Sequence, residues 1–474
     1  MAETKKIADD AKDAQEIAEA KRQESVRQAA ARYTPPKTPE TQAQVEWFKD
    51  QKFGLMIHWG LYNQLGMKES WTLVDNDWSK WQFKPGTTHS EMVELYSQLH
   101  KGFLPLRFDP DEWAETAYAA GFRYLVFTTK HHDGFCMWDT KTTDYKVTGS
   151  EVPWRNNKNA DITRALFDSF RAKGMGISAY YSRADFNCKY YWEDGYIQKG
   201  GTVRVPSYKS EEKPELWQKF KDFVFAQLKE LCTEYGRIDC LWYDGGCDGV
   251  KLGLPEMTDE LRKYQPHMLG VIRGGRGICE DIITPELIFP KDPIDVPWEV
   301  CTVMGKKMYE YGHDHTSFGY SYDQDYMTAK EVVHLLLDVV AKGGNLALNL
   351  GPQPDGRLPL RAVKHLGEVA EWMKYFAPAI HATRAAAPYR TGKYAYTASK
   401  DGKTVNAFYL YDDEESAPKD YLIPFEGKAI SVTDMRSGIE LNFTQTGNFL
   451  NVTLPDGVAG RPGDIADCFR VVRE

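Results

Sequence analysis

An aspartate at the end of an apolar run is the residue best suited to nucleophilic chemistry in this sequence. Asp244 closes the run at residues 240–243, and the two glycines after it leave open space beside its carboxylate. Such a carboxylate can attack the anomeric carbon of a glycoside, provided that a second carboxyl group protonates the departing oxygen. We therefore expect Asp244 to be a nucleophile, with the capping of a turn as the structural alternative.

Three glutamates compete for the role of the second carboxyl group: Glu280, Glu286 and Glu299. The acid needs a raised pKa, and apolar neighbours raise it because they disfavour the carboxylate form. Glu299 lies between Trp298 and Val300, so we predict that it is the acid/base, with Glu286 as the fallback. A reaction that retains configuration then requires the two carboxyl groups to lie about 5–5.5 Å apart.

Histidines follow two of the apolar runs. His58, His131 and His132 offer donors and acceptors that suit the hydroxyl groups of a sugar. Neighbouring residues on a regular strand point to opposite faces, so His131 and His132 reach one ligand only if the strand ends or distorts there. A metal ion bound by these histidines with Asp133 is one alternative, and simple packing is another.

Four segments together resemble the α-L-fucosidases of glycoside hydrolase family 29. They are residues 53–60, which end in His-Trp-Gly, residues 124–138, which contain Lys-His-His-Asp-Gly, residues 238–245, which end in Trp-Tyr-Asp-Gly, and residues 344–352, which end in Asn-Leu-Gly-Pro. The resemblance covers roughly residues 45–380. It implies an exo-acting, retaining α-L-fucosidase without a cofactor, in which Asp244 attacks C1 of a terminal fucose and Glu299 protonates the leaving oxygen.

Most of the candidate sugar contacts come from the same resemblance. They are His58, Glu69, Trp71, His131, His132, Tyr181, Trp242, Arg273 and Phe318, the last standing where family members commonly have Trp. Fucose carries a methyl group at C5, and Trp242 or Phe318 would supply the apolar wall that this methyl needs. For each aromatic residue taken singly, core packing is the structural alternative.

Other functions stay open on the residues alone. The chain could hydrolyse a related glycan, such as an α-L-galactoside or a sulfated fucan fragment, or it could be a catalytically inactive fucose-binding protein. A metal-dependent hydrolase is a further alternative, which inactivation by a chelator would reveal. The expected partner is a fucosylated oligosaccharide or polysaccharide, and the oligomeric state cannot be read from the sequence.

The elements that must position these residues alternate between strand and helix. Short apolar runs predict buried strands at residues 54–59, 124–129, 176–182, 238–243, 269–272 and 346–350. Helical patterns at residues 109–121, 162–173, 215–235 and 329–342 end at or beside a glycine. Repetition of these units predicts a (β/α)8-like barrel, and in such barrels the chemistry lies where the strands end.

Three regions are predicted along the chain. Residues 1–40 form a helical N-terminal extension with a Pro-rich spacer, and residues 41–385 form the catalytic barrel. Residues 386–474 carry short alternating runs separated by Asp-Gly and Ser-Gly turns, which predicts a C-terminal all-β sandwich.

Composition narrows the class of protein further. A net charge of −9 argues against nucleic acid, and the aromatic content of 13% favours carbohydrate. No apolar run approaches the ~18 residues of a membrane helix. The eight cysteines show no CxxC pair, so we expect buried thiols. The first residues carry no secretory signal, but a cleaved signal would leave the same sequence. Because the substrate class favours export, we expect a periplasmic or secreted protein whose signal has been removed, and a cytoplasmic location stays open as the alternative.

Overall fold

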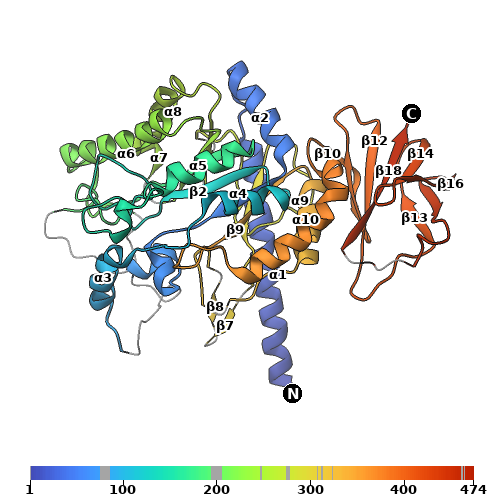
Figure 1. Ribbon diagram of the computed structural model, residues 1–474, viewed down its shortest axis with the longest axis horizontal. Coiled ribbons are helices and arrows are strands. Elements are labelled where there is room, and N and C mark those ends of the chain that lie inside the picture. The colour runs from blue at the N-terminus through green and yellow to red at the C-terminus, as the bar shows by residue number, and fades with distance from the viewer. Residues whose placement is uncertain are drawn as a thin grey trace.

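The computed structural model describes residues 2–74, 86–193, 205–245, 248–273, 278–306, 308–310, 313–315, 317–322, 324–460, 463 and 465–474. Its larger part is a sheet of parallel strands curled into a barrel and surrounded by helices (Figure 1). Its smaller part consists of antiparallel sheets formed by the C-terminal residues. This architecture confirms the predicted fold class. None of the described helices is long and apolar enough to span a membrane.

Seven parallel strands form the barrel sheet in the order β5-β4-β3-β2-β1-β9-β6. They are β1 (Phe53–Ile57), β2 (Tyr124–Lys130), β3 (Gly176–Ser182), β4 (Cys240–Asp244), β5 (Leu269–Ile272), β6 (Glu299–Val303) and β9 (Asn345–Leu350). The sequence predicts six of the seven. The exception is β6, which begins at Glu299, the residue predicted to be the acid/base.

An irregular segment, residues 281–287, fills the gap between β5 and β6. The amide of Asp281 donates to the carbonyl of Gly270 in β5 at 2.9 Å. On the other side, the amide of Glu299 donates to Ile283 O at 3.0 Å, and the amide of Leu287 donates to the β6 residue Cys301 at 3.0 Å. This segment therefore takes the place of a further strand and carries Glu286 in the barrel wall.

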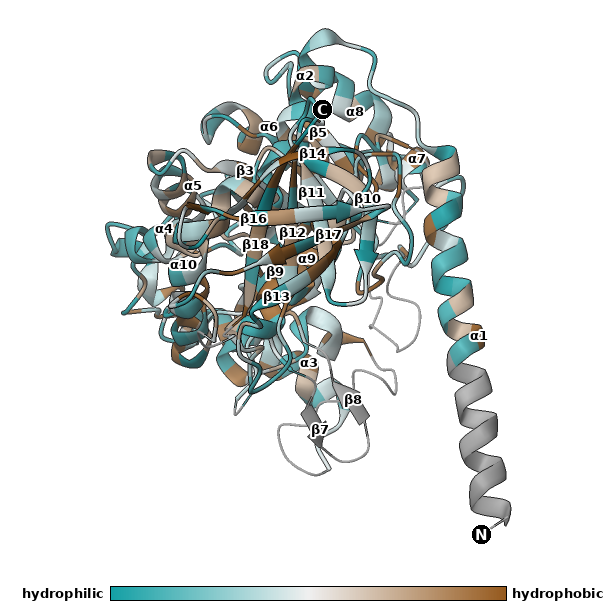
Figure 2. Ribbon diagram, turned by 90° about the vertical axis from the view of Figure 1, so that its right-hand side faces the viewer, coloured by the Kyte–Doolittle hydropathy of each residue, from teal (hydrophilic) through white to brown (hydrophobic). Residues whose placement is uncertain are grey.

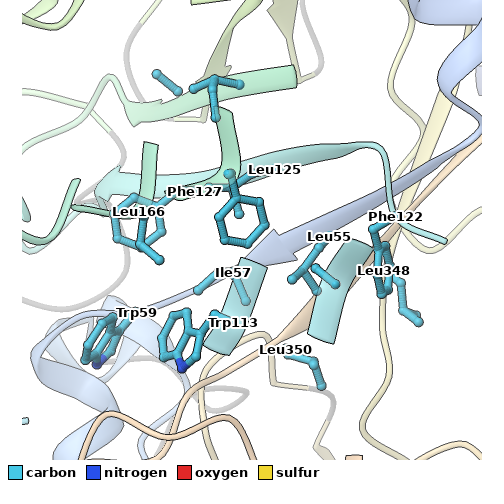
Figure 3. Packing of buried hydrophobic residues seen from close by; sticks show 14 of the residues in the cluster. Leu55, Ile57, Trp59, Trp113, Phe122, Leu125, Phe127, Leu166, Leu348 and Leu350 are labelled. Carbon is cyan, nitrogen blue, oxygen red and sulfur yellow. The ribbon is translucent and has the colours of Figure 1, made fainter. Parts of the chain in front are cut away.

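The alternation of side chains along the strands builds two layers of core. Met56, Val126, Tyr180, Trp242 and Ala347 are buried together on one face of the sheet, inside the barrel. The residues between them face outward and pack against the helices, as Figure 3 shows for β1, β2 and β9. The labelled outward side chains of these strands are Leu55, Ile57, Leu125, Phe127, Leu348 and Leu350, which pack near Trp113 and Leu166 of the surrounding helices.

The α-helices associated with the barrel sheet are α2 (Pro39–Gln51), α3 (His89–Gln98), α4 (Pro110–Ala119), α5 (Ile162–Ala172), α6 (Pro214–Glu234), α7 (Gly249–Leu252), α8 (Leu254–Arg262), α9 (Ala329–Ala341) and α10 (Leu360–Ile380). The four helices that the sequence predicts, α4, α5, α6 and α9, each end two residues before a glycine. Short 3-10 helices are η1 (Leu61–Leu65), η2 (Glu69–Leu73), η4 (Leu99–Gly102) and η5 (Pro153–Asn156). Asp109 caps α4 by accepting from the amides of Asp111 and Glu112 at 3.0 and 3.1 Å.

Two N-terminal helices support the barrel. Helix α1 (Ala2–Arg32) lies along the outer edge of the molecule (Figure 2), where Gln23 Nε2 donates to the carbonyl of Phe289 at 2.9 Å. Helix α2 packs at the N-terminal ends of the strands, because its Phe48 belongs to the interior cluster with Met56 and contacts the Tyr124 ring at a centroid distance of 5.6 Å. The mouth of the barrel is therefore at the opposite end.

The C-terminal part is a sandwich of two antiparallel sheets. One has the order β10-β11-β12-β18-β14-β15 and the other β13-β17-β16. Their strands are β10 (Arg384–Thr391), β11 (Tyr394–Ala398), β12 (Thr404–Leu410), β13 (Asp420–Pro424), β14 (Ala429–Asp434), β15 (Ile439–Glu440), β16 (Asn442–Thr446), β17 (Phe449–Thr453) and β18 (Ala466–Arg473). Outside these sheets, β7 (Met308–Glu310) pairs antiparallel with β8 (His313–His315).

Seven of the eight cysteines lie within the described residues, and none of these seven forms a disulfide. Six of them are buried and Cys279 is partly exposed. Buried thiols are therefore confirmed for the described cysteines, while Cys247 lies outside the described residues.

Candidate active site

A pocket of 410 Å³ lies where the barrel strands end. Its volume falls within the range of about 300–1,000 Å³ that is usual for small-molecule sites. Nine of the twelve residues predicted for the site line this pocket, whereas Glu299, Tyr181 and His132 do not. The lining residues are Met56, His58, Lys68, Glu69, Trp71, His131, Tyr180, Trp242, Asp244, Arg273, Glu286, Leu287, Cys301 and Phe318.

Asp244 is held ready as a carboxylate. The residue is 5% exposed at the end of β4, and its carboxylate accepts from the hydroxyl of Tyr180 and, at 3.2 Å, from Arg273 Nη1. Burial by itself would raise the pKa of Asp244, but the Arg273 charge, with His132 and Tyr180, holds that pKa well below its ordinary value. The side chain is therefore ionised at neutral pH, as an attacking carboxylate must be.

Arg273 connects Asp244 to a second carboxyl group. The Arg273 side chain forms an ion pair with Glu286 through Nε, while Nη1 contacts Asp244. The Glu286 side chain is 23% exposed and lines the pocket. Because one guanidinium touches both carboxylates, Asp244 and Glu286 lie on neighbouring parts of the same wall.

Glu299 lies at the other end of the barrel. It is the first residue of β6 and pairs with Asn345, the first residue of β9, so it faces the floor formed by α2. Its carboxylate accepts from Tyr124 Oη at 2.5 Å and from Trp242 Nε1 at 3.1 Å. Burial raises the pKa of Glu299, as the sequence argument expects, but the residue is 2% exposed and outside the pocket.

Tyr180, and not the predicted Tyr181, faces the pocket. Tyr180 pairs with Trp242 and Ser182 with Asp244 across the β3–β4 register, so all four share the inner face. Tyr181 points outward, where its hydroxyl contacts Lys130 Nζ at 2.8 Å. The sequence alone does not give the β3–β4 register, which is what orients Tyr180 like Trp242 and turns Tyr181 outward.

A bulge in β2 directs the two histidines. The β2–β3 register shifts between Thr128 and Lys130, which inserts one extra residue into β2. Lys130 consequently turns outward, where it forms a buried ion pair with Asp185 at 2.8 Å, and His131 turns into the pocket. His132 follows the end of the strand, and its Nε2 lies 3.5 Å from Asp244 Oδ2. The distortion that the sequence analysis required is thus present.

Each lining histidine is oriented by a polar neighbour that the sequence analysis left out. His58 Nδ1 lies 2.8 Å from Asn349 Oδ1, and His131 Nδ1 lies 2.5 Å from Ser70 Oγ. Burial lowers the pKa of His58 to about 4 and the pKa of His131 well below its ordinary value. Both rings are therefore neutral at pH 7 and present Nε2 to a ligand.

Glu69 lines the pocket and holds the backbone beside the Phe318 ring. Its carboxylate accepts from Ser317 Oγ at 2.9 Å, from the amide of Phe318 and from the amide of Gly319 at 2.9 Å. Its backbone adopts a left-handed φ of 42°, which costs free energy in a residue with a side chain. The ring of Phe318, held by these bonds, lies 4.9 Å from the ring of His58.

One grouping in the described residues has the composition of a metal site. The ligand atoms of His131, His132 and Asp244 lie within 4.8 Å of one another. Asp244 already pairs with the cation of Arg273, and His131 Nδ1 is engaged by Ser70. A positive side chain beside the only carboxylate of the group opposes a second cation.

A barrel mouth with two carboxylates, neutral histidines and aromatic walls defines a glycoside hydrolase. Comparison with known proteins agrees with this class. The sequence profile of the family described as Alpha-L-fucosidase matches residues 20–377. The chain therefore belongs to the α-L-fucosidase family.

Individual relatives resemble most of the chain. The tissue α-L-fucosidase of Mus musculus is 25% identical over 458 residues, which is 89% of this chain and 93% of that protein. The structure of α-L-fucosidase isoenzyme 1 from Paenibacillus thiaminolyticus has a TM-score of 0.72 at 29% identity and covers 92% of this chain and 100% of that one. A Thermotoga maritima α-fucosidase structure in complex with fucose has a TM-score of 0.70 at 25% identity, covering 93% and 100%.

Proposed function

We propose that this protein is an exo-acting, retaining α-L-fucosidase that removes terminal α-L-fucose from glycans through a fucosyl-enzyme intermediate. The observation that carries the proposal is the bridge made by Arg273, whose guanidinium contacts both Asp244 and Glu286 within one pocket. Asp244 is assigned as the nucleophile and Glu286 as the acid/base. Glu299, the first choice from the sequence, is too deeply buried on the floor side to reach a leaving group.

The reaction takes place in two displacements. In the first, an oxygen of Asp244 bonds to C1, the C1–O bond to the leaving group breaks, and Glu286 gives its proton to the departing oxygen. In the second, water attacks C1, the Glu286 carboxylate takes a proton from that water, and the bond between C1 and Asp244 breaks. Each carboxyl group returns to its starting state, and configuration at C1 is retained.

The pocket walls favour fucose over L-galactose. The ring of Trp242 stacks on Tyr180 at a centroid distance of 5.2 Å, and its Nε1 is engaged by Glu299 below. Trp242 and Phe318 therefore offer apolar surface for the C5 methyl group, whereas a C6 hydroxyl group would lose its solvation there. The Thermotoga maritima relative, whose structure contains fucose, supports fucose as the bound sugar.

A chemical-rescue experiment tests the assignment. We would assay the wild type, Asp244→Gly and Glu286→Ala on 4-nitrophenyl α-L-fucoside, and then add sodium azide to each variant. Azide should yield β-fucosyl azide from Asp244→Gly, by direct displacement, and α-fucosyl azide from Glu286→Ala, by attack on the intermediate. The reverse pattern, or full activity in Glu286→Ala, would contradict the assignment.

The remaining alternatives give different results in the same assay. A wild type that binds fucose without turnover would be an inactive fucose-binding protein, and faster hydrolysis of the α-L-galactoside would change the substrate. Because Arg273 opposes a cation beside Asp244, EDTA should leave the activity unchanged. Loss of activity in EDTA with recovery on added Zn²⁺ would support a metal-dependent hydrolase.

The substrate class also supports a location outside the cytoplasm, where glycans with terminal fucose are encountered. Fractionation of the source cells, with the protein followed by antibody, tests this part of the proposal. Recovery with cytoplasmic markers alone would refute it.

A further inference from the structure

A second and larger cavity meets the catalytic pocket at Glu286. This leaving-side groove has a volume of 1240 Å³ and is lined by residues of β6, by the start of α9 and by Asp412 and Asp413 of the sandwich. Glu286 and Leu287 line both cavities. These two residues therefore form the threshold between the pocket and the groove.

The position of Glu286 determines which part of a substrate would enter the groove. An acid/base must lie beside the oxygen that joins fucose to the leaving group. Fucose itself occupies the pocket between Asp244 and the lining histidines, so the leaving group starts at Glu286 and extends away from Asp244. Among the described residues, the leaving-side groove is the cavity that begins at this carboxyl group.

The backbone at the threshold is fixed in a strained conformation. Leu287 has a left-handed φ of 55°, which residues with a side chain seldom adopt, and its amide is bonded to the carbonyl of Cys301. This conformation leaves the Leu287 side chain 36% exposed beside the Glu286 carboxylate. An exposed apolar surface at this point suits the face of a sugar ring bonded to the departing oxygen.

Helix α1 provides part of the far wall of the groove. Arg22 lines the groove, and the adjacent Gln23 fixes the helix by donating to Phe289 O at 2.9 Å and accepting from the amide of Lys291 at 3.1 Å. Gln23 is 8% exposed, so these bonds are sheltered from water. The N-terminal extension is thus held against the segment that carries Glu286.

The charges in the groove favour a neutral ligand. Lys306 pairs with Glu331 at 2.9 Å, and Lys330 pairs with Asp413 at 2.9 Å. Arg22 is the third cation of the lining, and the four carboxyl groups of Glu286, Glu331, Asp412 and Asp413 outnumber these three cations, which disfavours a sulfated ligand. Met327 adds an apolar surface to the same lining.

We infer that the leaving-side groove binds a neutral, extended oligosaccharide as the leaving group of the substrate, an inference that rests on the proposed function. The volume exceeds the range of about 300–1,000 Å³ usual for small-molecule pockets, which favours several sugar units over one small aglycone. Arg22 and Met327 are specificity-determining residues that contact this oligosaccharide. Helix α1 is therefore part of the substrate site.

The test compares substrates with and without a leaving group that fills the groove. We would measure kcat/KM for α-L-fucosyl fluoride and for the best substrate in a panel of neutral fucosylated oligosaccharides of different linkage. Met327→Ala and Arg22→Ala should lower kcat/KM for the oligosaccharide at least fivefold and change the fluoride value less than twofold. Met327→Trp, which fills the groove, should produce a larger loss on the oligosaccharide alone.

Leu422→Ala in β13 is the matched control, because Leu422 is 59% exposed on the sandwich and outside the groove. It should leave both values unchanged, and circular dichroism would establish that each variant is folded. Equal losses on both substrates, no loss on the oligosaccharide, or a preference for a sulfated fucan oligosaccharide would overturn the inference. A wild type inactive even on the fluoride would instead refute the proposed function.

Discussion

Glu286 and Glu299 occupy opposite ends of one barrel and show how different the surroundings of two carboxyl groups can be. Glu299 lies on the floor, 2% exposed, with its oxygens bonded to Tyr124 and Trp242. The Glu286 side chain lies at the mouth, 23% exposed and paired with Arg273. Burial raises the pKa of Glu299, yet only Glu286 borders space that a substrate can enter.

The comparison teaches that position along a strand outranks chemical neighbourhood. Apolar neighbours disfavour a carboxylate at either end of a barrel, so they cannot tell a catalytic acid from a structural one. The position of the residue along its strand does distinguish the two, because the active site is formed by loops at the carboxyl ends of the strands and not at their amino ends. Glu299 begins its strand, whereas Asp244 ends one.

Substitution of each of the two glutamates tests the roles assigned to them. Glu286→Ala should lower kcat/KM for a fucosylated oligosaccharide by about a thousandfold, because its poor leaving group needs the proton. Glu299→Gln keeps the shape of the buried group and should change the value less than about fivefold. Steady-state kinetics on both variants measure this, and the opposite ranking would return the acid/base role to Glu299.

Two adjacent tyrosines of β3, Tyr180 and Tyr181, provide a second test of how position on a strand determines function. Tyr180→Phe removes a hydrogen bond to an ionised carboxylate and should reduce kcat/KM about 10- to 100-fold. Tyr181→Phe should leave kcat/KM within about twofold, because Tyr181 faces Lys130 outside the pocket, and should lower the melting temperature instead. Similar kinetic losses in both variants would contradict the assigned orientation.

The contact of Arg273 with Asp244 predicts how the pH dependence of kcat/KM changes when Arg273 is replaced. Without the charge of Arg273, burial dominates and the pKa of Asp244 rises, so the carboxylate is protonated at higher pH. The acid limb of kcat/KM in Arg273→Met should therefore move upward, measured on 2-chloro-4-nitrophenyl α-L-fucoside, which needs little acid assistance. Arg273→Lys should restore part of the shift, and an unmoved limb would remove Arg273 from this role.

The ionisation of Glu299 makes the stability of the barrel floor depend on pH. Because the folded pKa of Glu299 is raised, its contribution to stability is present below its unfolded pKa and is lost as the pH rises through the folded value. Glutamine carries no charge, so Glu299→Gln should melt about 1–3 °C above the wild type at pH 7.5. The difference should vanish below about pH 4, and calorimetry at both pH values would test it.

Periodic patterns predicted most of the fold because burial imposes them. Six barrel strands and the capped helix α4 follow from apolar runs, Asp109 and Pro110. Residues 299–303 were missed because the run is short and begins with a glutamate, although Val300, Thr302 and Val303 are typical of strands. Without this strand, the sequence did not show that Glu299 lies at the amino end of a barrel strand.

The site was predictable where a residue type alone carries the chemistry, as for Asp244 and His58. It was not predictable where long-range geometry decides, as for the bulge that turns His131 inward and for Asn349 beside His58. The choice between Tyr180 and Tyr181 also depended on long-range geometry, because the pairing of β3 with β4 orients Tyr180 like Trp242. Register is therefore the information that the sequence analysis most lacked.

The barrel and the sandwich share an apolar interface, which determines how the protein unfolds and how it can be truncated. Trp372 of α10 donates to Ala466 O of β18 at 2.8 Å, and its ring lies 6.1 Å from Phe408 of β12, within one continuous apolar cluster. The two parts should consequently denature together, as a single endotherm. A chain truncated to the barrel would expose the apolar face of α10 and should precipitate. Truncation of this protein should therefore not remove the C-terminal sandwich.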